Sequence, residues 1–370
     1  MPSAAHPGHL YIGLMSGTSL DGVDAVLADF SSARPRLLGH SHAAFAPELR
    51  DQLLQLTVSG ADEIERAGVA AQSLARIYSE AVHQLLRAAA VAPSAVSAIG
   101  AHGQTIRHRP EQGFTVQLNA PALIAELTGI AVVADFRSRD LAAGGQGAPL
   151  VPAFHAAVFS HNSPRAVVNI GGISNISALP AAGDGGLVTG FDCGPGNLLL
   201  DAWVNRHRGL AYDADGAWGA AGAVDQGLLE RLLSDEFFAA APPKSTGRER
   251  FNLDWLHDHL QQEAPVDVQA TLLALTAAGI AEAIERWCPE AADVLVCGGG
   301  AHNGALMAQL SQRCGGRPVA STASAGVAPG HVEALAFAWL AYTHVSRAAG
   351  NLPAVTGACG ARILGAYYPA

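Results

Sequence analysis

The chain has 370 residues, of which 49% are hydrophobic and 15% are charged, and it contains 41 glycines. This composition excludes a disordered chain, and the length allows about two domains at the usual ~100–200 residues each. The formal net charge is −10, and Lys244 is the single lysine, which argues against a nucleic-acid-binding surface. The five cysteines form no Cys-x-x-Cys pair, so the sequence encodes neither a zinc knuckle nor a disulfide framework.

The first ten residues lack the basic and apolar regions of a signal peptide, and no run of ~18 uncharged apolar residues follows. The odd number of cysteines agrees with a reducing compartment. We therefore expect a globular cytoplasmic protein that binds neither nucleic acid nor a membrane.

The first half begins with two predicted strands, 11–14 and 23–30, joined by a glycine-containing turn over 17–22, and residues 36–45 can add a third strand. A mostly helical region, a short strand, a helix opened by proline and a further strand are predicted at 48–90, 96–103, 121–128 and 130–136. This half therefore reads as three strands followed by alternating helix and strand.

The same pattern begins again at residue 166. Residues 166–179 read as strand, glycine turn and strand, and 187–193 as a third strand. Helices are predicted at 198–207, 269–287, 304–310 and 333–345, and a strand at 293–297. The repeated order predicts a duplicated α/β fold.

The glycine turns of both hairpins suit phosphate binding, because glycine lets backbone N–H groups approach anionic oxygens. In the first turn, Gly17 and Gly22 flank hydroxyl donors and carboxylates, of which Asp21 could orient a nucleotide-borne Mg²⁺. The alternative is that these glycines only form a hairpin turn. A second glycine hairpin at Gly171 and Gly172 favours the phosphate interpretation.

The loop of Gly298, Gly299 and Gly300 follows a predicted strand and has two interpretations. It resembles the start of a dinucleotide fingerprint, but the next glycine, Gly304, falls one residue late, and residues 320–330 contain no acid for a ribose. We therefore favour a loop that covers an adenosine.

The order of these three glycine elements resembles the superfamily of sugar kinases, actin and heat-shock ATPases. The resemblance implies a duplicated ribonuclease H-like, actin-like, two-lobed ATPase fold with a central cleft. We expect lobes at 1–140 and 141–345, with the tail at 346–370 returning to the first lobe. Met15 departs from the superfamily pattern, because it occupies the position of a usual aspartate.

Longer motifs resemble the anhydro-N-acetylmuramic acid kinase family over nearly the whole chain. These motifs lie at residues 13–24, 101–105, 135–137, 144–150, 169–172, 191–197, 201–203, 244–249, 297–300, 333–340 and 351–357. Residues 117–120, Gln-Leu-Asn-Ala, depart from the expected pattern in one loop.

The resemblance implies an ATP-dependent kinase that acts on 1,6-anhydro-N-acetylmuramic acid in peptidoglycan recycling and amino-sugar degradation. Water would open the anhydro ring at C1 while O6 receives the γ-phosphate, giving N-acetylmuramic acid 6-phosphate. The family also implies ATP with Mg²⁺ and a homodimer. Attack of water at an anomeric carbon requires a carboxylate base.

Asp192 is the predicted base, because it follows a strand and precedes glycines that would give a sugar close access. The alternative is an Asx turn over Asp192-Cys-Gly-Pro. Lys244 is either a solvated lysine or, together with Arg248, a residue that orders a loop on the nucleotide side.

Substrate-binding residues are predicted at strand ends and at one helix start. Arg137, with Arg139 nearby, could bind the lactyl carboxylate by bidentate hydrogen bonds. His102 is either a ligand or a structural histidine. Glu333 could compensate a helix dipole, but the resemblance makes it a substrate ligand. The full substrate set is His102, Gln104, Arg137, Asn197 and Glu333. The predicted nucleotide set is Gly17, Thr18, Ser19, Leu20, Asp21, Gly22, Val23, Asp24, Gly171, Gly172, Gly298, Gly299, Gly300 and Asn303, with Asp21 also near the metal.

Two other functions remain open on the sequence alone. A kinase of another anhydro sugar, such as levoglucosan, would need no arginine aimed at a carboxylate. A nucleotide switch of the actin or heat-shock type would need a peptide-binding appendage or filament surfaces, for which two lobes leave little chain.

Overall fold

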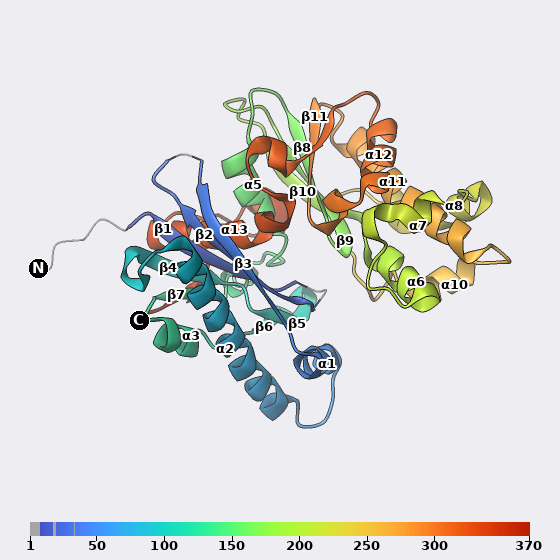
Figure 1. Ribbon diagram of the computed structural model, residues 1–370. Helices are drawn as coiled ribbons and strands as arrows, with labels where there is room; N and C mark the ends of the chain where they lie inside the picture. The colour runs from blue at the N-terminus through green and yellow to red at the C-terminus, as the bar shows by residue number, and fades with distance from the viewer. Residues whose placement is uncertain (1–7, 18–19, 33) are drawn as a thin grey trace, which may run out of the picture. The chain divides into compact units, whose positions relative to one another are not determined.

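The computed structural model describes residues 8–17, 20–32 and 34–370. These residues form two compact units: unit 1 combines the chain up to Val158 with His331–Ala370, and unit 2 is Phe159–Gly330. Unit 1 therefore joins the blue and red ends of the colour scale in Figure 1. The sequence-based lobes, 1–140 and 141–345, differ from these units, because residues 141–158 and the helix that begins at 332 lie in unit 1.

The sheet of unit 1 has the strand order β13, β7, β4, β1, β2, β3. The bounds are β1 (Leu10–Met15), β2 (Gly22–Asp29), β3 (Arg36–Ala44), β4 (Val96–Ala101), β7 (Val132–Ala134) and β13 (Ala366–Tyr368). Strands β1, β2 and β3 are antiparallel neighbours, whereas β4 and β7 run parallel to β1. The carboxyl ends of β1, β4 and β7 therefore meet at one edge, where ligands usually bind in open α/β sheets.

Helices cover both faces of this sheet, because successive residues of a strand face opposite sides. Ile12 of β1 joins a core that includes α2 (Glu63–Ala89). On the other face α13 (Val332–Val345) lies so close that a Cβ at Gly13 would be 1.8 Å from the carbonyl oxygen of Ala334. This close approach explains why α13 belongs to unit 1.

The sheet of unit 2 has the order β10, β9, β8, β11, β12. The bounds are β8 (Arg165–Ile170), β9 (Ile173–Leu179), β10 (Thr189–Pro195), β11 (Asp293–Cys297) and β12 (Val319–Ser321). Strands β8, β9 and β10 are antiparallel, and β11 and β12 run parallel to β8. Both units thus repeat the order third, second, first, fourth, fifth strand. This ribonuclease H-like order confirms the predicted duplicated α/β fold, and the predicted cleft stays a prediction.

A long apolar helix, α11 (Pro265–Trp287), runs through the core of unit 2. By length and composition it could span a membrane, but 89% of its most apolar window is buried inside the protein. Its side chains share one hydrophobic core with β8, β10 and α12 (Gly304–Arg313). Burial on this scale is typical of the core helix of a globular domain.

The remaining elements connect these layers. The helices are α1 (Pro47–Gln55), α3 (Pro121–Thr128), α4 (Ser138–Leu141), α5 (Val151–Phe159), α6 (Leu198–Arg208), α7 (Ala217–Ala220), α8 (Gln226–Leu233), α9 (Glu236–Ala239), α10 (Leu253–His259) and α14 (Pro353–Thr356). A separate hairpin comprises β5 (Gln104–Arg109) and β6 (Phe114–Leu118). Short 3-10 helices occur at Pro93–Ala95, Pro110–Gln112, Ala214–Gly216, Gly299–His302, Thr322–Ala325 and Pro329–His331.

The strands and helices predicted from the sequence occur in the structure, and the region 48–90 divides into α1 and α2. The hairpin β5–β6, the helices α4, α5, α7 to α10 and α14, and the short strands β12 and β13 were not predicted. Those among them with only three or four residues carry too little periodicity to be read locally, and packing against neighbours stabilises them.

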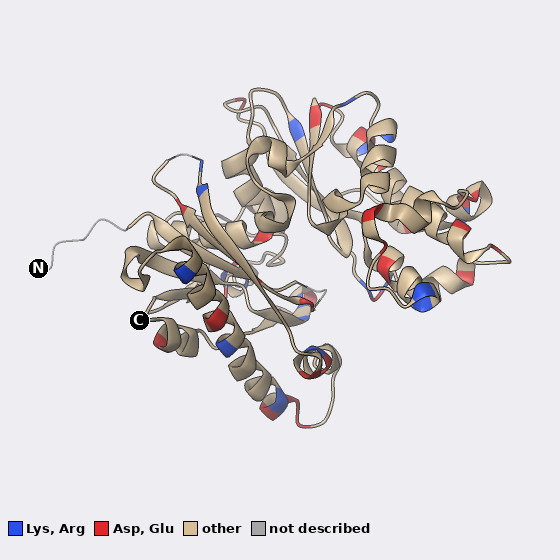
Figure 2. Ribbon diagram, in the orientation of Figure 1, with Lys and Arg blue, Asp and Glu red and all other residues tan. Residues whose placement is uncertain are grey.

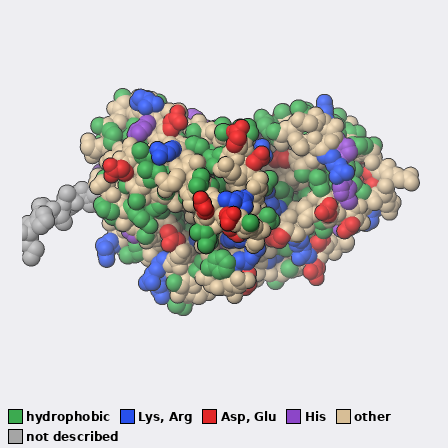
Figure 3. All heavy atoms as spheres, turned by 90° about the horizontal axis from the view of Figure 1, so that it is seen from below, with side chains coloured by type: hydrophobic (Ala, Val, Ile, Leu, Met, Phe, Trp, Pro, Cys, Tyr) green, Lys and Arg blue, Asp and Glu red, His purple; other side chains and the backbone are tan. Residues whose placement is uncertain are grey.

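Charged residues lie mostly on helices and loops, and the strands carry few of them (Figure 2). An exception is the pair Arg165 and Asp293, which begin the adjacent strands β8 and β11 with Nη2 and Oδ2 2.6 Å apart. On the face drawn in Figure 3, basic and acidic side chains are interspersed rather than gathered by sign. That face shows no basic patch of the kind that binds nucleic acid.

Candidate functional site

In unit 1, the loops after β1 and β4 meet at the carboxyl edge of the sheet. The backbone N–H of His102 donates to the carbonyl of Leu14 at 3.1 Å. Gln104 Nε2 donates to the carbonyl of Gly17 at 3.2 Å. The buried Ser16 hydroxyl lies 2.5 Å from the hydroxyl of Tyr78. The structure therefore brings Gly17, His102 and Gln104 together, as their positions at strand ends predict.

The first glycine turn leads into buried residues of the hydrophobic core. Leu20 has a left-handed φ of 57° and donates its N–H to the carbonyl of Gly17 at 3.3 Å. The side chains of Leu20 and Val23 belong to the hydrophobic core, and the whole residues are only 5% and 0% exposed, so neither offers a nucleotide an open backbone surface. Thr18 and Ser19 lie outside the described residues. A Cβ at Gly22 would be 2.4 Å from the carbonyl of Ala43, so β3 also requires this glycine.

The two carboxylates of this turn differ in their surroundings. Asp24 Oδ1 lies 2.9 Å from Nδ1 of His42, its neighbour across β2 and β3. Asp21 is exposed at the start of β2. Magnesium carried by a nucleotide is held by one or two carboxylates and the phosphates, and the role of Asp21 toward such an ion stays a prediction. Among the described residues, no group of three or more His, Cys, Asp or Glu side chains is arranged to hold a metal.

Arg137 follows β7 and joins the same edge of the sheet. Its Nη2 donates to Nε2 of His102 at 2.9 Å, and its Nη1 donates to the carbonyl of Gly147 at 2.8 Å. Burial lowers the pKa of Arg137 to about 10, while the charges of Glu333 and Asp140 act in the opposite direction. Burial and the charge of Arg137 hold the pKa of His102 well below its ordinary value. The imidazole is therefore neutral and accepts from the guanidinium.

Glu333 lies in the first turn of α13, half-buried, where its charge acts on Arg137. The sequence-based boundary at residue 345 placed Glu333 in the second lobe. In the structure α13 packs against β1 and β4, so Glu333 lies in unit 1 with His102, Gln104 and Arg137. Four of the five predicted substrate residues thus lie in this unit.

In unit 2, Asp192 lies at an irregularity of β10, where the register with β9 shifts between Asp192 and Gly194. Its Oδ2 accepts a hydrogen bond from the backbone N–H of Thr246 at 2.9 Å. Burial raises the pKa of Asp192 to about 6, and the charge of Glu249 also raises it, against the lowering effects of the Thr246 N–H and Lys244. This carboxylate can act as a base near neutral pH.

The segment that contains Lys244 lies beside Asp192. The backbone N–H of Asp192 donates to the carbonyl of Lys244 at 3.1 Å. The Lys244 ammonium in turn donates to the carbonyl of Phe237 at 2.8 Å. The contacts of this segment hold it against Asp192, and its expected place on the nucleotide side stays a prediction. Thr246 was missed by the sequence reasoning, although the motif at 244–249 had marked the segment.

The glycine loops of unit 2 pack against one another. The N–H groups of Gly196 and Asn197 donate to the carbonyls of Gly172 and Gly171 at 2.9 and 2.8 Å. Asn197 Nδ2 donates to the carbonyl of Ile170 at 3.2 Å. The structure thus brings Asn197 together with the second glycine hairpin.

The loop of Gly298, Gly299 and Gly300 packs against the same segment of unit 2. Gly298 has a φ of 78°, and a Cβ there would be 2.3 Å from Oδ1 of Asn169. A Cβ at Gly300 would be 2.3 Å from Cγ2 of Ile170, and one at Gly299 would be 3.4 Å from Nδ2 of Asn197. Close packing therefore accounts for glycine at 298 and 300, whereas Gly299 has more room beside it.

The sequence matches a known family over almost its whole length. The profile described as anhydro-N-acetylmuramic acid kinase matches residues 9–370. The chain is 55% identical over 379 residues to the anhydro-N-acetylmuramic acid kinase of Cupriavidus metallidurans, with 100% of both chains covered. It is 56% identical over 375 residues to that of Bordetella parapertussis, covering 100% of this chain and 98% of the relative. The chain belongs to the anhydro-N-acetylmuramic acid kinase family.

Membership in the anhydro-N-acetylmuramic acid kinase family makes this protein an enzyme, a phosphotransferase that uses ATP and a small sugar. Among solved structures, the chain is similar to the activator of 2-hydroxyisocaproyl-CoA dehydratase from Clostridium difficile with bound ADPNP. The alignment covers 91% of this chain and 96% of the activator chain. Its sequence identity is 10% and its TM-score is 0.48. The assignment to the kinase family rests on the sequence relatives.

Asn303, predicted to contact the nucleotide of this kinase, has a structural task in the fold. Its side-chain oxygen accepts from the N–H of Leu306 at 3.0 Å and so caps α12. A Cβ at Gly216 would lie 2.3 Å from the same oxygen. The role of Asn303 toward a nucleotide stays a prediction.

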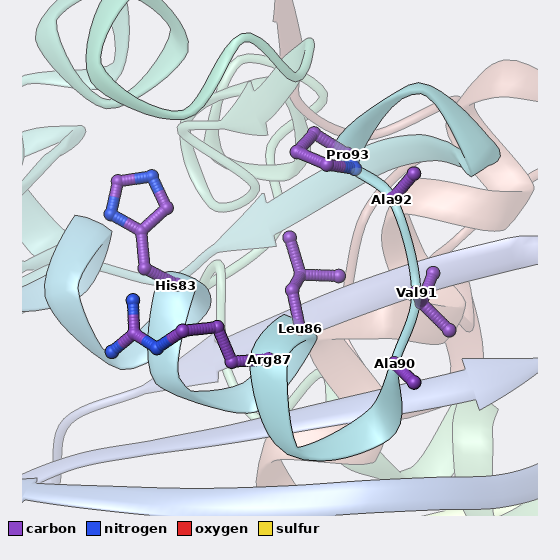
Figure 4. Close-up of a pocket in the computed structure, with 7 residues that line it drawn as sticks. All are labelled: His83, Leu86, Arg87, Ala90, Val91, Ala92 and Pro93. Carbon is purple, nitrogen blue, oxygen red and sulfur yellow. The ribbon is translucent and has the colours of Figure 1, made fainter.

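A hollow of about 380 Å³ lies at the end of α2 in unit 1 (Figure 4). It is lined by His83, Leu86, Arg87, Ala90, Val91, Ala92 and Pro93. These residues do not belong to any predicted site of the kinase, and aliphatic side chains form most of the wall. The hollow therefore plays no part in the function proposed below.

Proposed function

We propose that this kinase opens the 1,6-anhydro ring of 1,6-anhydro-N-acetylmuramic acid with water and transfers the γ-phosphoryl group of ATP to O6. The product is N-acetylmuramic acid 6-phosphate. The observation that carries the proposal is the partly buried carboxylate of Asp192, held by the Thr246 N–H and with a pKa raised to about 6. Phosphorylation of a free hydroxyl alone does not require a base that activates water at an anomeric carbon, whereas opening of the anhydro ring by water does.

The chemistry assigns one task to Asp192. It takes a proton from a water molecule whose oxygen bonds to C1, while the bond between C1 and O6 breaks. O6 leaves with the bonding electron pair and attacks the γ-phosphorus, so ADP departs with the electrons of the broken phosphoanhydride bond. Because O6 is both leaving group and phosphoryl acceptor, a separate acid is not required for its departure.

The residues of unit 1 are proposed to recognise the sugar. Arg137 presents a guanidinium to the lactyl carboxylate, an interaction for which its planar donors are suited. Neutral His102 orients that guanidinium through its hydrogen bond. Gln104 and Glu333 contact hydroxyl or amide groups of the sugar, and Asn197 in unit 2 contributes a further contact.

The glycine turns are proposed to hold the nucleotide. Backbone N–H groups of the turn at residues 17–22 and of the Gly171–Gly172 hairpin bind phosphate oxygens, and the Gly298–Gly300 loop with Asn303 lies beside the adenosine. Asp21 is the residue proposed to meet Mg²⁺. When bound, the ion would neutralise charge on the β- and γ-phosphates.

The proposal places the enzyme in peptidoglycan recycling and amino-sugar degradation in the cytoplasm, as a homodimer. The five cysteines, all among the described residues, form no disulfide, which supports a reducing compartment.

The deciding experiment incubates the purified protein with ATP, Mg²⁺ and 1,6-anhydro-N-acetylmuramic acid in ¹⁸O-labelled water. We expect a product that has gained both a phosphate and one ¹⁸O atom at C1. Phosphate transfer without label would contradict the ring-opening step. Faster turnover of levoglucosan would favour the other anhydro-sugar kinase, and ATP hydrolysis unaffected by either sugar would favour a nucleotide switch.

A further inference from the structure

A carboxylate outside the proposed catalytic set, Asp140 of α4, is fully buried in unit 1. Its Oδ1 accepts hydrogen bonds from Nδ2 of Asn351 at 2.6 Å and from the hydroxyl of Thr356 at 2.7 Å. Its Oδ2 accepts from the backbone N–H of Gly147 at 2.8 Å. A buried carboxylate with partners on both oxygens is suited to holding other groups in place.

The partners of Asp140 come from the C-terminal segment and from the glycine loop after α4. Two backbone bonds join the same parts of the chain: the N–H of Gln146 donates to the carbonyl of Thr356, and that of Cys359 to the carbonyl of Ala143, both at 2.8 Å. A Cβ at Gly145 would be 2.2 Å from Oδ2 of Asp140. The loop is therefore clamped closely between α4 and residues 351–359.

The clamped loop ends at a direct contact with Arg137. The carbonyl of Gly147, the residue whose N–H bonds to Asp140, accepts from Nη1 of Arg137 at 2.8 Å. His102 accepts from Nε and Nη2 of the same guanidinium at 3.3 and 2.9 Å. A guanidinium has five N–H donors, so these contacts fix its plane from two sides and leave one N–H on each of Nη1 and Nη2 for another acceptor.

We propose that Asp140, through Asn351, Thr356 and the Gly147 peptide, is a positioning residue that aims Arg137 at the carboxylate of the sugar substrate. This inference rests on the proposed function, in which Arg137 binds the lactyl carboxylate. The two remaining N–H bonds of Nη1 and Nη2 can meet the two oxygens of a carboxylate only if the guanidinium keeps its plane. Removing a hydrogen-bond donor to Asp140 should therefore weaken binding of the carboxylate specifically.

The test compares two ligands that differ in the carboxylate. Binding of 1,6-anhydro-N-acetylmuramic acid and of 1,6-anhydro-N-acetylglucosamine, which lacks the lactyl group, is measured by calorimetry, with kcat and KM for the acid. Thr356→Val removes one donor to Asp140 at nearly constant volume, and Thr356→Ser restores it. Thr343→Val is the matched control, because the buried Thr343 hydroxyl donates to Leu340 in the same unit without touching Asp140.

We expect Thr356→Val to weaken binding of the acid and raise its KM by about three- to tenfold, as for the loss of one buried hydrogen bond. Binding of the neutral sugar and the value of kcat should change by less than about twofold, and Thr356→Ser and Thr343→Val should resemble the unmodified protein. The positioning role would be overturned if Thr356→Val weakened binding of both sugars equally, or if it weakened binding of neither. If Thr356→Val fails to unfold cooperatively on heating, Asn351→Ala removes the other donor to Oδ1 and is tested in the same way.

Arg137→Gln separates this inference from the function on which it rests. If Arg137→Gln leaves the preference for the acid over the neutral sugar unchanged, Arg137 does not bind the carboxylate, and both assignments fall. If Arg137→Gln abolishes the preference and neither Thr356→Val nor Asn351→Ala reduces it, only the positioning role of Asp140 is wrong.

Discussion

Arg137 donates a hydrogen bond from Nη2 to Nε2 of His102 at 2.9 Å, so this histidine supports an arginine instead of carrying a charge of its own. The bond requires an unprotonated Nε2. Burial and the neighbouring guanidinium hold the pKa of His102 well below its ordinary value. The pair therefore persists across the neutral pH range, and the guanidinium keeps one orientation.

Replacing His102 tests this pairing. We expect His102→Ala to raise KM for the anhydro sugar by about tenfold or more, because a hydrogen bond to a charged group is lost. The value of kcat should change less than KM. Steady-state kinetics with the sugar varied at saturating ATP measures both. His161→Ala, at an exposed loop in unit 2, is the control, and an unchanged KM for His102→Ala would remove the histidine from the site.

Replacing the proposed base tests the ring-opening step. Asp192→Asn keeps the shape of the side chain and cannot accept a proton, so we expect turnover to fall by ~10²–10⁴-fold with nucleotide binding retained. In the unmodified enzyme, log kcat should fall as the pH drops through about 6, the pKa to which burial raises Asp192. Asp184→Asn, on an exposed loop, should behave normally. Turnover within about twofold of normal in folded Asp192→Asn would exclude Asp192 as base.

The same pKa predicts a dependence of stability on pH. The native pKa of Asp192, about 6, lies above its ordinary value of 3.8, so the native state binds more protons than the unfolded state between these values. The contribution of Asp192 to stability therefore decreases as the pH rises through this window. We expect Asp192→Asn to unfold at higher urea concentration than the unmodified protein at pH 8, with a smaller difference at pH 4. A lower urea midpoint for Asp192→Asn than for the unmodified protein at pH 8 would contradict the view that burial of the charged Asp192 carboxylate destabilises the native state.

The first glycine turn is proposed to bind phosphate through its backbone. Gly17→Val places a branched side chain where N–H groups would approach the phosphates, and we expect the dissociation constant for ATP to rise by about tenfold or more. Calorimetric titration with a non-hydrolysable ATP analogue measures it. Gly68→Val, at a helical position with nothing within 4 Å of a new Cβ, is the matched control. Unchanged affinity for Gly17→Val would make the turn structural.

Close packing of α13 on β1 gives a prediction about stability. A Cβ at Gly13 would be 1.8 Å from the carbonyl of Ala334, so Gly13→Ala must move the helix or the strand. We expect a loss of about 1–3 kcal/mol or more in the free energy of unfolding, as for other overpacked sites. Gly68→Ala should instead stabilise the protein by about 0.5–1 kcal/mol. Urea denaturation compares the two, and equal stabilities would show that the helix shifts without cost.

Local patterns predicted the strands, the long helices and the glycine turns. Period-two and period-3.6 hydrophobicity are properties of neighbouring residues, so β1, β2, β8, β9 and α11 could be read directly. The repeat of strand, glycine turn and strand also indicated the duplicated fold. Parallel strands bring their carboxyl ends to one edge, which explains why Gly17, His102 and Arg137 could be expected together. The family motifs predicted the kinase.

Contacts between distant segments could not be read in this way. Asp140 bonds to residues 211 and 216 positions later in the chain, and Asp192 bonds to Thr246, 54 positions later. The membership of α13 in unit 1 likewise depends on Gly13 and Gly100, which leave room for the helix backbone. The sequence by itself determined the family and the strand ends at which the predicted site residues lie. Tertiary structure decided which distant groups hold Arg137 and Asp192 in place, because hydrogen bonds of buried side chains depend on packing rather than on sequence spacing.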